Sequence, residues 1–240
     1  MFNKKCTIEY DGTFFSGWQL QKNSKTVQAE VMDALKKIYK VPVNVIGAGR
    51  TDSGVHALGQ VFNFNSYKLI DNRALLFGLN SILSDNIAVK AVEDVPLDFH
   101  ARYSAKKKVY LYKIFNSNLK AAFYSKRSWW VKKKMNIKDI EFLMNIFVGE
   151  FDFRPFCQDS KIYKNTIRKI YYVNVRDIDS IIEIEICANG FLRKMARLIV
   201  GTVIKLAIDD DIQLDNYKEV AKKTKLVAPP EGLYLKEVVY

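Results

Sequence analysis

The residues best suited to chemistry stand in one glycine-rich run from Gly47 to Ala57, which reads GAGRTDSGVHA. Three glycines within eight positions indicate a tight backbone path with unusual dihedral angles. The flanking segments alternate as strands do, and a loop between strands is a common place for catalytic groups held by a rigid scaffold. Within this loop Asp52 supplies a carboxylate that can act as a nucleophile or as a base.

Three chemical interpretations of this loop compete. A phosphate-binding loop is disfavoured because the glycine spacing differs from the dinucleotide fingerprint, no G-K-[ST] ending is present and no helix is predicted to follow. An aspartic protease needs two carboxylates that share a proton; a homodimer supplies two, but such enzymes are all-β and Arg50 would hold Asp52 ionised. The third interpretation is a single catalytic carboxylate, and its plain alternative is an Asp that caps its own turn.

Composition narrows the class of partner. The formal net charge is +12. Such an excess is explained either by a solvated, lysine-rich surface or by a nucleic-acid partner. The nucleic acid is the more specific explanation, because lysine and arginine displace counterions from phosphates. No apolar run is long enough to cross a bilayer and no basic amphipathic helix has an aromatic apolar face, so no membrane is expected. The cysteines Cys6, Cys157 and Cys187 are far apart, and only two histidines are present, which argues against disulfides and metal sites. Without an apolar signal segment behind Met1, we expect a reduced, cytoplasmic protein.

The first half of the chain has the element order β-α-β-β-α-β, which is that of a ferredoxin-like unit. Its predicted strands cover residues 5–10, 43–46, 60–65 and 87–95, and its predicted helices cover 26–39 and 71–81. Thr26 is the expected cap of the first helix.

The second half repeats this order loosely. Its predicted strands cover residues 109–115, 167–175, 181–187 and 232–240, and its predicted helices cover 137–147, 191–206 and 215–223. The join near 100–105 does not resemble a linker. We therefore expect an α+β protein of two halves, 1–103 and 104–240, that share one mainly antiparallel sheet with helices on one face.

Five further segments, together with the loop, resemble the tRNA pseudouridine synthase A family. The loop matches the family's G-R-T-D-x-G-V-H-A in full. The other matches, in family order, are Y-D-G-T-x-F-x-G-W-Q-x-Q at 10–21, F-H-A-R-x-S-A at 99–105, G-x-x-D-F-x-x-F at 149–156, N-x-F-L-x-x-M-x-R-x-I-V-G at 189–201 and A-P-P-x-G-L at 228–233. They span nearly the whole chain. The departures, Ala196 and Leu198, stand where valine and a polar residue are common, and they spare the charged positions.

The resemblance implies a pseudouridine synthase fold of two ferredoxin-like (RRM-like) halves. It also implies an isomerase that converts uridine to pseudouridine at positions 38, 39 and 40 in the anticodon stem-loop of tRNA. In this family Asp52 would attack the target uridine, either on the base or on the ribose C1′, and the base would rejoin through carbon. No cofactor is implied, because the reaction is an isomerisation. The implied partners are tRNA and a second copy of the chain in a homodimer.

The resemblance gives roles to three more residues. Arg197 is expected to hold Asp52 charged through a bidentate pair; without the resemblance, the helix at 191–206 would present a solvated basic face containing Arg193, Lys194 and Arg197. Tyr110 is expected to stack on the uridine and to assist proton removal from C5, and its plain alternative is a core aromatic.

Arg50 is expected to contact the phosphate backbone or to fill the space left by the flipped base, unless it is an ordinary charged loop residue. We expect Phe14, Phe15 and Trp18 to anchor the loop rather than to contact RNA. An RNA-recognition module is the main non-enzyme alternative, although its K/R-G-F/Y pattern is absent from the sequence. The lysine clusters are expected to mix RNA-gripping and solvated residues: Lys106–Lys108, Lys132–Lys134, Lys222, Lys223 and Lys225.

Overall fold

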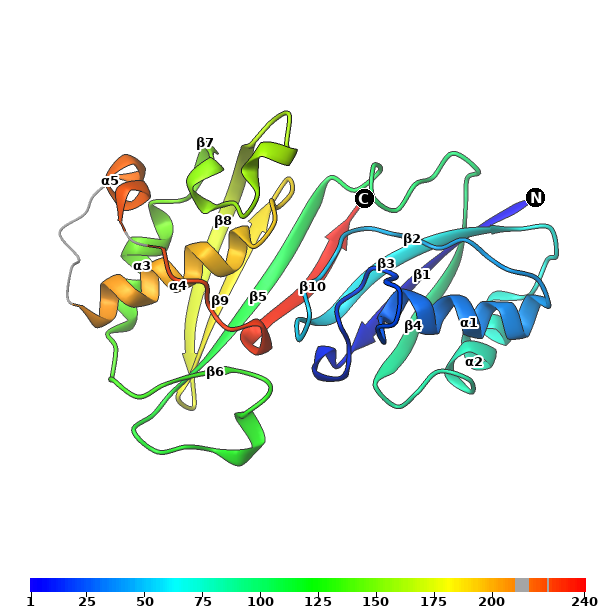
Figure 1. Cartoon of the computed structure of the whole chain (residues 1–240), viewed down its shortest axis with the longest axis horizontal. Helices are drawn as coiled ribbons and strands as arrows, with labels where there is room; N and C mark the ends of the chain where they lie inside the picture. The colour runs from blue at the N-terminus through cyan, green and yellow to red at the C-terminus, as the bar shows by residue number, and fades with distance from the viewer. Residues whose placement is uncertain (210–215, 224) are drawn as a thin grey trace. The chain divides into compact units, whose positions relative to one another are not determined.

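A computed structural model describes residues 1–209, 216–223 and 225–240 (Figure 1). The chain forms two compact units. The first unit contains Met1–Lys106 together with Tyr234–Tyr240, and the second contains Lys107–Leu233. In the part of the chain described, no helix is both long and apolar enough to span a membrane.

The first unit is built on β3 (His56–Ser66), which is buried along most of its length. β1 (Phe2–Tyr10) lies antiparallel to β3 on one side and to β4 (Ile87–Val95) on the other. The short strand β2 (Ile46–Gly47) is also antiparallel to β3, and β10 (Leu233–Val239) runs parallel to it at the start of β3. The chain enters β3 directly from the glycine-rich loop, so the scaffold fixes one end of that loop.

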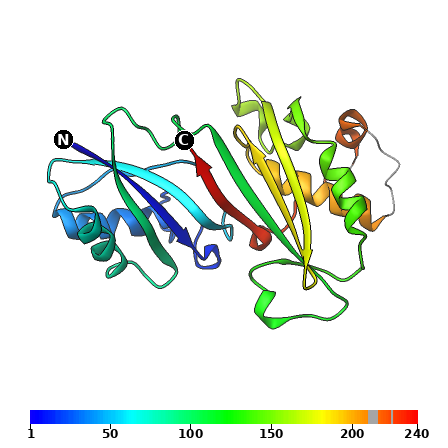
Figure 2. The same ribbon diagram turned by 180° about the vertical axis from the view of Figure 1, so that it is seen from behind.

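Two helices of this unit, α1 (Val27–Tyr39) and α2 (Asn72–Asn80), lie on one face of its strands (Figures 1 and 2). The predicted cap of α1 is confirmed, because the Thr26 hydroxyl accepts a bond from the Ala29 N–H at 3.4 Å. Asp71 caps α2 by accepting bonds from two backbone N–H groups, each at 3.0 Å. These caps satisfy backbone donors that have no partner within the helix.

In the second unit four strands follow one another in the order β5 (Lys107–Asn116), β9 (Ile181–Ala188), β8 (Ile167–Ile178) and β7 (Gly149–Asp152), all antiparallel. The short strand β6 (Trp129–Val131) runs parallel to β5. β8 and β9 form a hairpin, and its turn uses left-handed backbone at Asp179 and Ser180.

The helices of the second unit also share one face of its strands (Figures 1 and 2). α3 (Ile137–Asn145) begins after Asn136, whose side chain accepts a bond from the Lys138 N–H. α3 packs against β8 and against α4 (Met195–Ile208), which is buried along nearly all of its length. α5 (Tyr217–Lys222) is capped by Asn216. Five short 3-10 turns complete the described elements: Gly12–Phe14, Ala122–Tyr124, Arg154–Phe156, Ser160–Ile162 and Pro230–Gly232.

The expected mixed α/β class with mainly antiparallel strands is confirmed. Several boundaries differ from the sequence expectation; β3, for example, begins at His56 rather than at residue 60. The strand predicted at 43–46 is reduced to β2, and α4 starts at Met195 because Lys194 has a left-handed φ of 61°, which a right-handed helix excludes. α5 is shorter than the predicted 215–223, of which Asp215 lies outside the described residues.

The units also differ from the expected halves, 1–103 and 104–240, at the C-terminus. β10 follows the second unit in sequence, yet Tyr234 lies opposite His56 of β3, and the Lys106 N–H donates to Val239 O at 2.8 Å. An alternating strand pattern tells which face is buried but not which strand lies alongside. The sequence of β10 therefore does not reveal that this strand pairs with β3 of the first unit.

Candidate active site

The glycine-rich loop is held on one side by β3. The Ala48 N–H donates to Val61 O at 2.7 Å, and the Gln60 side chain donates through Nε2 to Gly49 O at 2.9 Å. Both partners belong to the buried part of β3. The loop therefore leaves β2 along a fixed path before it reaches Asp52.

The opening motif at 10–21 holds the other side of the loop. The Trp18 N–H donates to Thr51 O at 3.2 Å. At Gly17, whose φ is +89°, an added Cβ would lie 2.5 Å from Thr51 O. Only glycine adopts this backbone without strain and leaves room for the approach. The spacing of glycine and tryptophan in the opening motif is thus explained by contact with the loop.

Asp52 begins a tight turn. The Val55 N–H donates to Asp52 O at 3.2 Å, and Gly54 has a φ of +78°. Phe15 O accepts bonds from the Gly54 N–H at 3.4 Å and from the Ser53 hydroxyl at 3.3 Å. The Asp52 side chain is half-buried. Its backbone is therefore fixed on both sides by hydrogen bonds, which is how a rigid scaffold positions a reactive group.

A buried aromatic layer lies beneath the loop. Trp18 packs its indole against Gly47 and its ring lies 6.4 Å from that of Tyr10. The Tyr10 hydroxyl lies 2.8 Å from the Thr51 hydroxyl. Phe15 and Trp18 are buried, which agrees with the expected anchoring role, whereas Phe14 is exposed.

His56 fixes the end of the loop, where β3 starts. Its Nδ1 accepts a bond from the Gly12 N–H at 3.1 Å and lies 3.3 Å from Asp11 Oδ1. The imidazole stacks on Tyr234 with ring centroids 4.7 Å apart. Sequence reasoning assigned no role to Tyr10, Asp11, Thr51 or His56, although all four lie in the quoted motifs.

Arg50 shares the loop with Asp52 and is exposed. Its Nε donates to Gln19 Oε1 at 3.0 Å, and Gln19 Nε2 in turn donates to Gln28 Oε1 at 2.7 Å. The opening motif therefore orients the Arg50 side chain while leaving its charge at the surface. In the described residues, no group of three or more acidic, histidine or cysteine side chains is arranged to hold a metal ion.

The other two predicted site residues belong to the second unit. Tyr110 is buried on β5, opposite Ile186 of β9, and Phe191 meets its ring edge-on at a centroid distance of 4.7 Å. Arg197 is buried on α4 and donates through Nε to Ala228 O at 2.8 Å. The Ala228 N–H donates back to Arg197 O at 3.0 Å. The closing motif A-P-P-x-G-L therefore fixes the arginine.

The plain alternative for this helix, a solvated basic face, does not hold. Arg193 and Lys194 precede α4, and Arg193 pairs with Asp159 at 2.5 Å. Arg197, the one member within the helix, is buried. The cause is close packing on that side, since a Cβ added at Gly201 would lie only 2.0 Å from Leu226 O.

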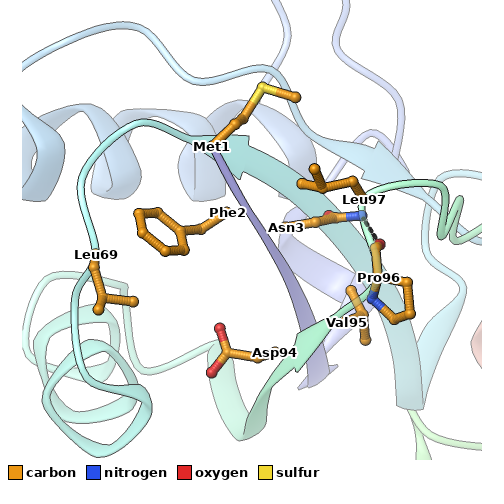
Figure 3. Close-up of a pocket in the computed structure, with 8 residues that line it drawn as sticks. All are labelled: Met1, Phe2, Asn3, Leu69, Asp94, Val95, Pro96 and Leu97. Carbon is orange, nitrogen blue, oxygen red and sulfur yellow. Dashed lines mark hydrogen bonds between the residues drawn. The ribbon is translucent and has the colours of Figure 1, made fainter.

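A surface pocket of about 380 Å³ lies at the N-terminus of the first unit (Figure 3). Its lining is mainly apolar, and its charged member, Asp94, binds Lys4 at 2.7 Å and accepts a bond from Asn72 at 2.9 Å. The pocket includes none of the residues of the glycine-rich loop. Its carboxylate, Asp94, is engaged by Lys4 and Asn72, so the loop is the better candidate for chemistry.

Comparison with known proteins shows the family to which the chain belongs. A family model described as tRNA pseudouridine synthase matches residues 7–104 and 143–240. The chain belongs to this family. Relatives named tRNA pseudouridine synthase A from Caldicellulosiruptor bescii and Acetivibrio thermocellus are 40% and 41% identical to it over 100% of both chains. A solved structure titled as a Cbf5-Nop10-Gar1 complex aligns with 82% of this chain and 46% of its own, at a TM-score of 0.42 and 15% identity. Membership in the tRNA pseudouridine synthase family confirms the resemblance recognised in the sequence.

Proposed function

We propose that this chain isomerises uridine to pseudouridine in tRNA, at positions 38, 39 and 40 of the anticodon stem-loop, with Asp52 as the nucleophile. The main observation behind the proposal is that β3 and the opening motif both hold the loop that contains the Asp52 carboxylate. Backbone bonds from β3 and from the opening motif fix the turn that presents Asp52. Such fixed positioning lowers the barrier because the reacting groups need little reorganisation.

A carboxylate suits this reaction because it can add to an electrophilic carbon and later leave. Attack on the ribose C1′ displaces N1 directly, whereas attack on the base first forms an adduct whose bond between N1 and C1′ then breaks. The base then turns so that C5 meets C1′, and a new carbon–carbon bond forms. C5 loses its proton and N1 gains one, so the product is an isomer of the substrate and no cofactor is consumed.

Arg197 is proposed to keep Asp52 ionised and oriented. A guanidinium presents five N–H donors in a planar fork, so the bond from Nε to Ala228 O is compatible with a bidentate pair through its other nitrogens. Burial of the arginine strengthens such a pair, because less water competes for its donors.

Tyr110 is proposed to stack on the target uracil and to assist removal of the C5 proton. The edge-on contact with Phe191 fixes the plane of the tyrosine ring. A uridine taken out of its helix needs a π-face to replace the stacking that it loses.

Arg50 is proposed either to contact the phosphate backbone or to fill the space that the flipped base leaves. Its exposure and its bond to Gln19 suit both roles. We further infer a cytoplasmic homodimer in which each tRNA lies across both subunits.

Release of tritium from tRNA labelled at uridine C5 tests the proposal, with mapping of the modified positions. Wild type should release tritium and modify positions 38–40, whereas Asp52→Ala should bind tRNA without release. Asp33→Ala, which removes an exposed carboxylate on α1, is the matched control and should behave as wild type. Binding without release in the wild type would favour an RNA-recognition module. Full tritium release by Asp52→Ala would show that the Asp52 carboxylate takes no part in the reaction.

A further inference from the structure

The positive charge of this chain is concentrated in one stretch. Between Asp98 and Asp139 stand twelve lysines and arginines and no acidic residue. This stretch accounts for the whole formal net charge of +12, so the remainder of the chain is electrically balanced. Most of it lies between the two regions matched by the family model, 7–104 and 143–240.

Residues 117–134 of this stretch form a closed loop in the second unit, which we call the basic arm. It leaves β5 after Asn116 and returns through β6, and Figures 1 and 2 show it as the green loop beside β6. The Asn116 side chain closes its base by donating to Val131 O at 3.0 Å and Lys133 O at 2.8 Å, and by accepting from the Met135 N–H. The arm is therefore a fixed projection rather than a slack connection.

The inside of the arm is also ordered. The buried Ser128 hydroxyl donates to Tyr124 O at 2.9 Å, and the Tyr124 ring packs on Phe115 at 5.1 Å. Trp130 donates through Nε1 to Ser117 O at 2.7 Å, and the Lys120 ammonium lies 5.3 Å from its ring centroid. These contacts order the interior of the arm.

The outer surface combines cations with apolar groups. Phe123 is 91% exposed, and Leu119 and Trp130 are also exposed. Lys133 donates to Ile208 O at the end of α4, which gives it a structural role. The exposed cations of the arm are Lys120, Lys126, Arg127, Lys132, Lys133 and Lys134.

We propose that the basic arm is an RNA-docking surface, on which Lys132 and Lys134 contact phosphates and Phe123 stacks on an unpaired base. The inference rests on the proposed function, which supplies tRNA as the polyanion. Paired bases are stacked on their neighbours, whereas nucleotides in loops and bulges can offer a base face to an aromatic side chain. The arm therefore selects an unpaired nucleotide flanked by backbone phosphates.

A second copy of this chain fits the arm poorly. A two-fold interface centred on the arm would place the cations of one arm opposite those of the other. Like charges across an interface oppose association. A polyanion meets the same surface with opposite charge and releases counterions as it binds.

The charge is tested by measuring tRNA affinity as a function of salt for Lys132→Gln/Lys134→Gln. Each lysine that contacts a phosphate contributes about one to the slope of log affinity against log salt, so the slope should fall by about two. The matched control is Lys36→Gln/Lys37→Gln, which removes two exposed lysines from α1 and should leave the slope unchanged. Equal slopes for the arm variant and wild type would overturn the phosphate contacts.

The stacking is tested with Phe123→Ala, against Phe142→Ala, an exposed phenylalanine on α3. Loss of one stacked base should weaken tRNA binding at least about fivefold without changing the salt slope. Phe142→Ala should bind as wild type. A photoreactive phenylalanine analogue at position 123 should crosslink to tRNA; a crosslink to a second protein chain, or none, would contradict the proposal.

Failure of this inference is distinguishable from failure of the proposed function. If wild type releases no C5 tritium, the proposed function is wrong whatever the arm does. If wild type modifies tRNA while the arm variants bind and turn over as it does, the arm is not an RNA surface. A change of sedimentation in the arm variants with unchanged tRNA affinity would instead identify a contact between copies and overturn the proposal.

Discussion

The hydroxyl groups of Tyr10 and Thr51 lie 2.8 Å apart beneath the turn that presents Asp52. Burial raises the pKa of Tyr10, so the phenol stays neutral and keeps its hydrogen for this network. We expect Tyr10→Phe to destabilise the fold by about 1–3 kcal/mol, because the buried Thr51 hydroxyl loses a partner. Since Asp52 follows Thr51 directly, kcat should also fall while KM for tRNA stays constant.

Steady-state kinetics and urea unfolding check this expectation. Tyr67→Phe is the control, because Tyr67 is 89% exposed in the same unit and should change neither quantity. Loss of stability in Tyr10→Phe with an unchanged kcat would show that the bond supports the fold and not the position of Asp52.

Gly17 allows the opening motif to approach the loop, and Gly17→Ala should disrupt that approach. The new Cβ would lie 2.5 Å from Thr51 O, on a backbone with φ of +89°. Strain of about 1–3 kcal/mol is the expected cost for a non-glycine residue in such a conformation, in addition to the steric clash. We therefore expect a lower midpoint of thermal unfolding and a marked loss of turnover.

Gly78→Ala is the matched substitution in α2. There the added Cβ would meet only Ile38 Cδ1, at an ordinary distance of 3.5 Å. Alanine in place of a helical glycine should stabilise by about 0.5–1 kcal/mol, since glycine loses more freedom on folding. If both variants unfolded and turned over alike, the contact between Gly17 and Thr51 would not position the loop.

Local sequence signals predicted the longer elements well. The Thr26 cap and the apolar spacing behind it suffice for α1, and β4 has the predicted bounds. β6 and β7 have three and four residues. Strands this short do not show a clear alternation of buried and exposed residues, so the sequence did not predict them. The pairing of β10 with β3 depends on strand neighbours that no local pattern specifies.

The site was predicted in part. The glycine-rich motif located the loop, and the geometry explains why glycine stands at positions 17 and 54. The contacts between the loop and the opening motif join residues about forty positions apart. The sequence therefore shows both motifs but does not show that they contact each other. The spacing of Arg193, Lys194 and Arg197 suggested one basic helix face, but α4 begins only at Met195, so the first two residues lie outside the helix.

Arg197 is fixed by Ala228, and Arg197→Lys should remove most activity. A lysine keeps the charge but lacks the planar fork that a bidentate pair with Asp52 requires, and it loses the Nε bond to Ala228 O. A charge-assisted bond of about 1.5–3 kcal/mol corresponds to a fall in kcat/KM of roughly 10- to 150-fold. Single-turnover kinetics measure it.

Arg193→Lys is the control for that substitution. Arg193 is exposed and pairs with Asp159, and a lysine can maintain such a surface pair. Turnover should stay near that of wild type. Near-normal turnover in Arg197→Lys as well would argue against the pairing with Asp52.

Tyr110→Phe separates the two roles proposed for this tyrosine. The ring that meets Phe191 edge-on is retained, so tRNA affinity should stay unchanged. Without the phenol, release of C5 tritium should slow by about 100-fold or more if the hydroxyl assists proton transfer. Tyr110→Leu removes the ring and should weaken binding as well. A full rate in Tyr110→Phe would leave only the stacking role.

Asp94 accepts a bond from the buried Lys4, and Asp94→Asn should weaken the acid dependence of stability (Figure 3 shows Asp94). The hydrogen bond from Lys4 holds the pKa of Asp94 below its usual range. A carboxyl group with a lowered pKa in the folded state stabilises above its unfolded pKa, near 4, and this stabilisation disappears as the pH falls through the folded pKa.

At neutral pH, Asp94→Asn leaves the Lys4 ammonium without its anion. The cost should be about 1 kcal/mol or more, yet below the 3–5 kcal/mol of a fully buried pair, because Asp94 is 57% exposed and solvent screens it. Urea unfolding at several pH values measures both effects. Glu93→Gln, which breaks the more exposed pair with Lys5, is the control and should change stability by less than about 1 kcal/mol. If the curves of Asp94→Asn and wild type stayed parallel from neutral pH down to acid, the carboxyl group of Asp94 would not be a source of acid sensitivity.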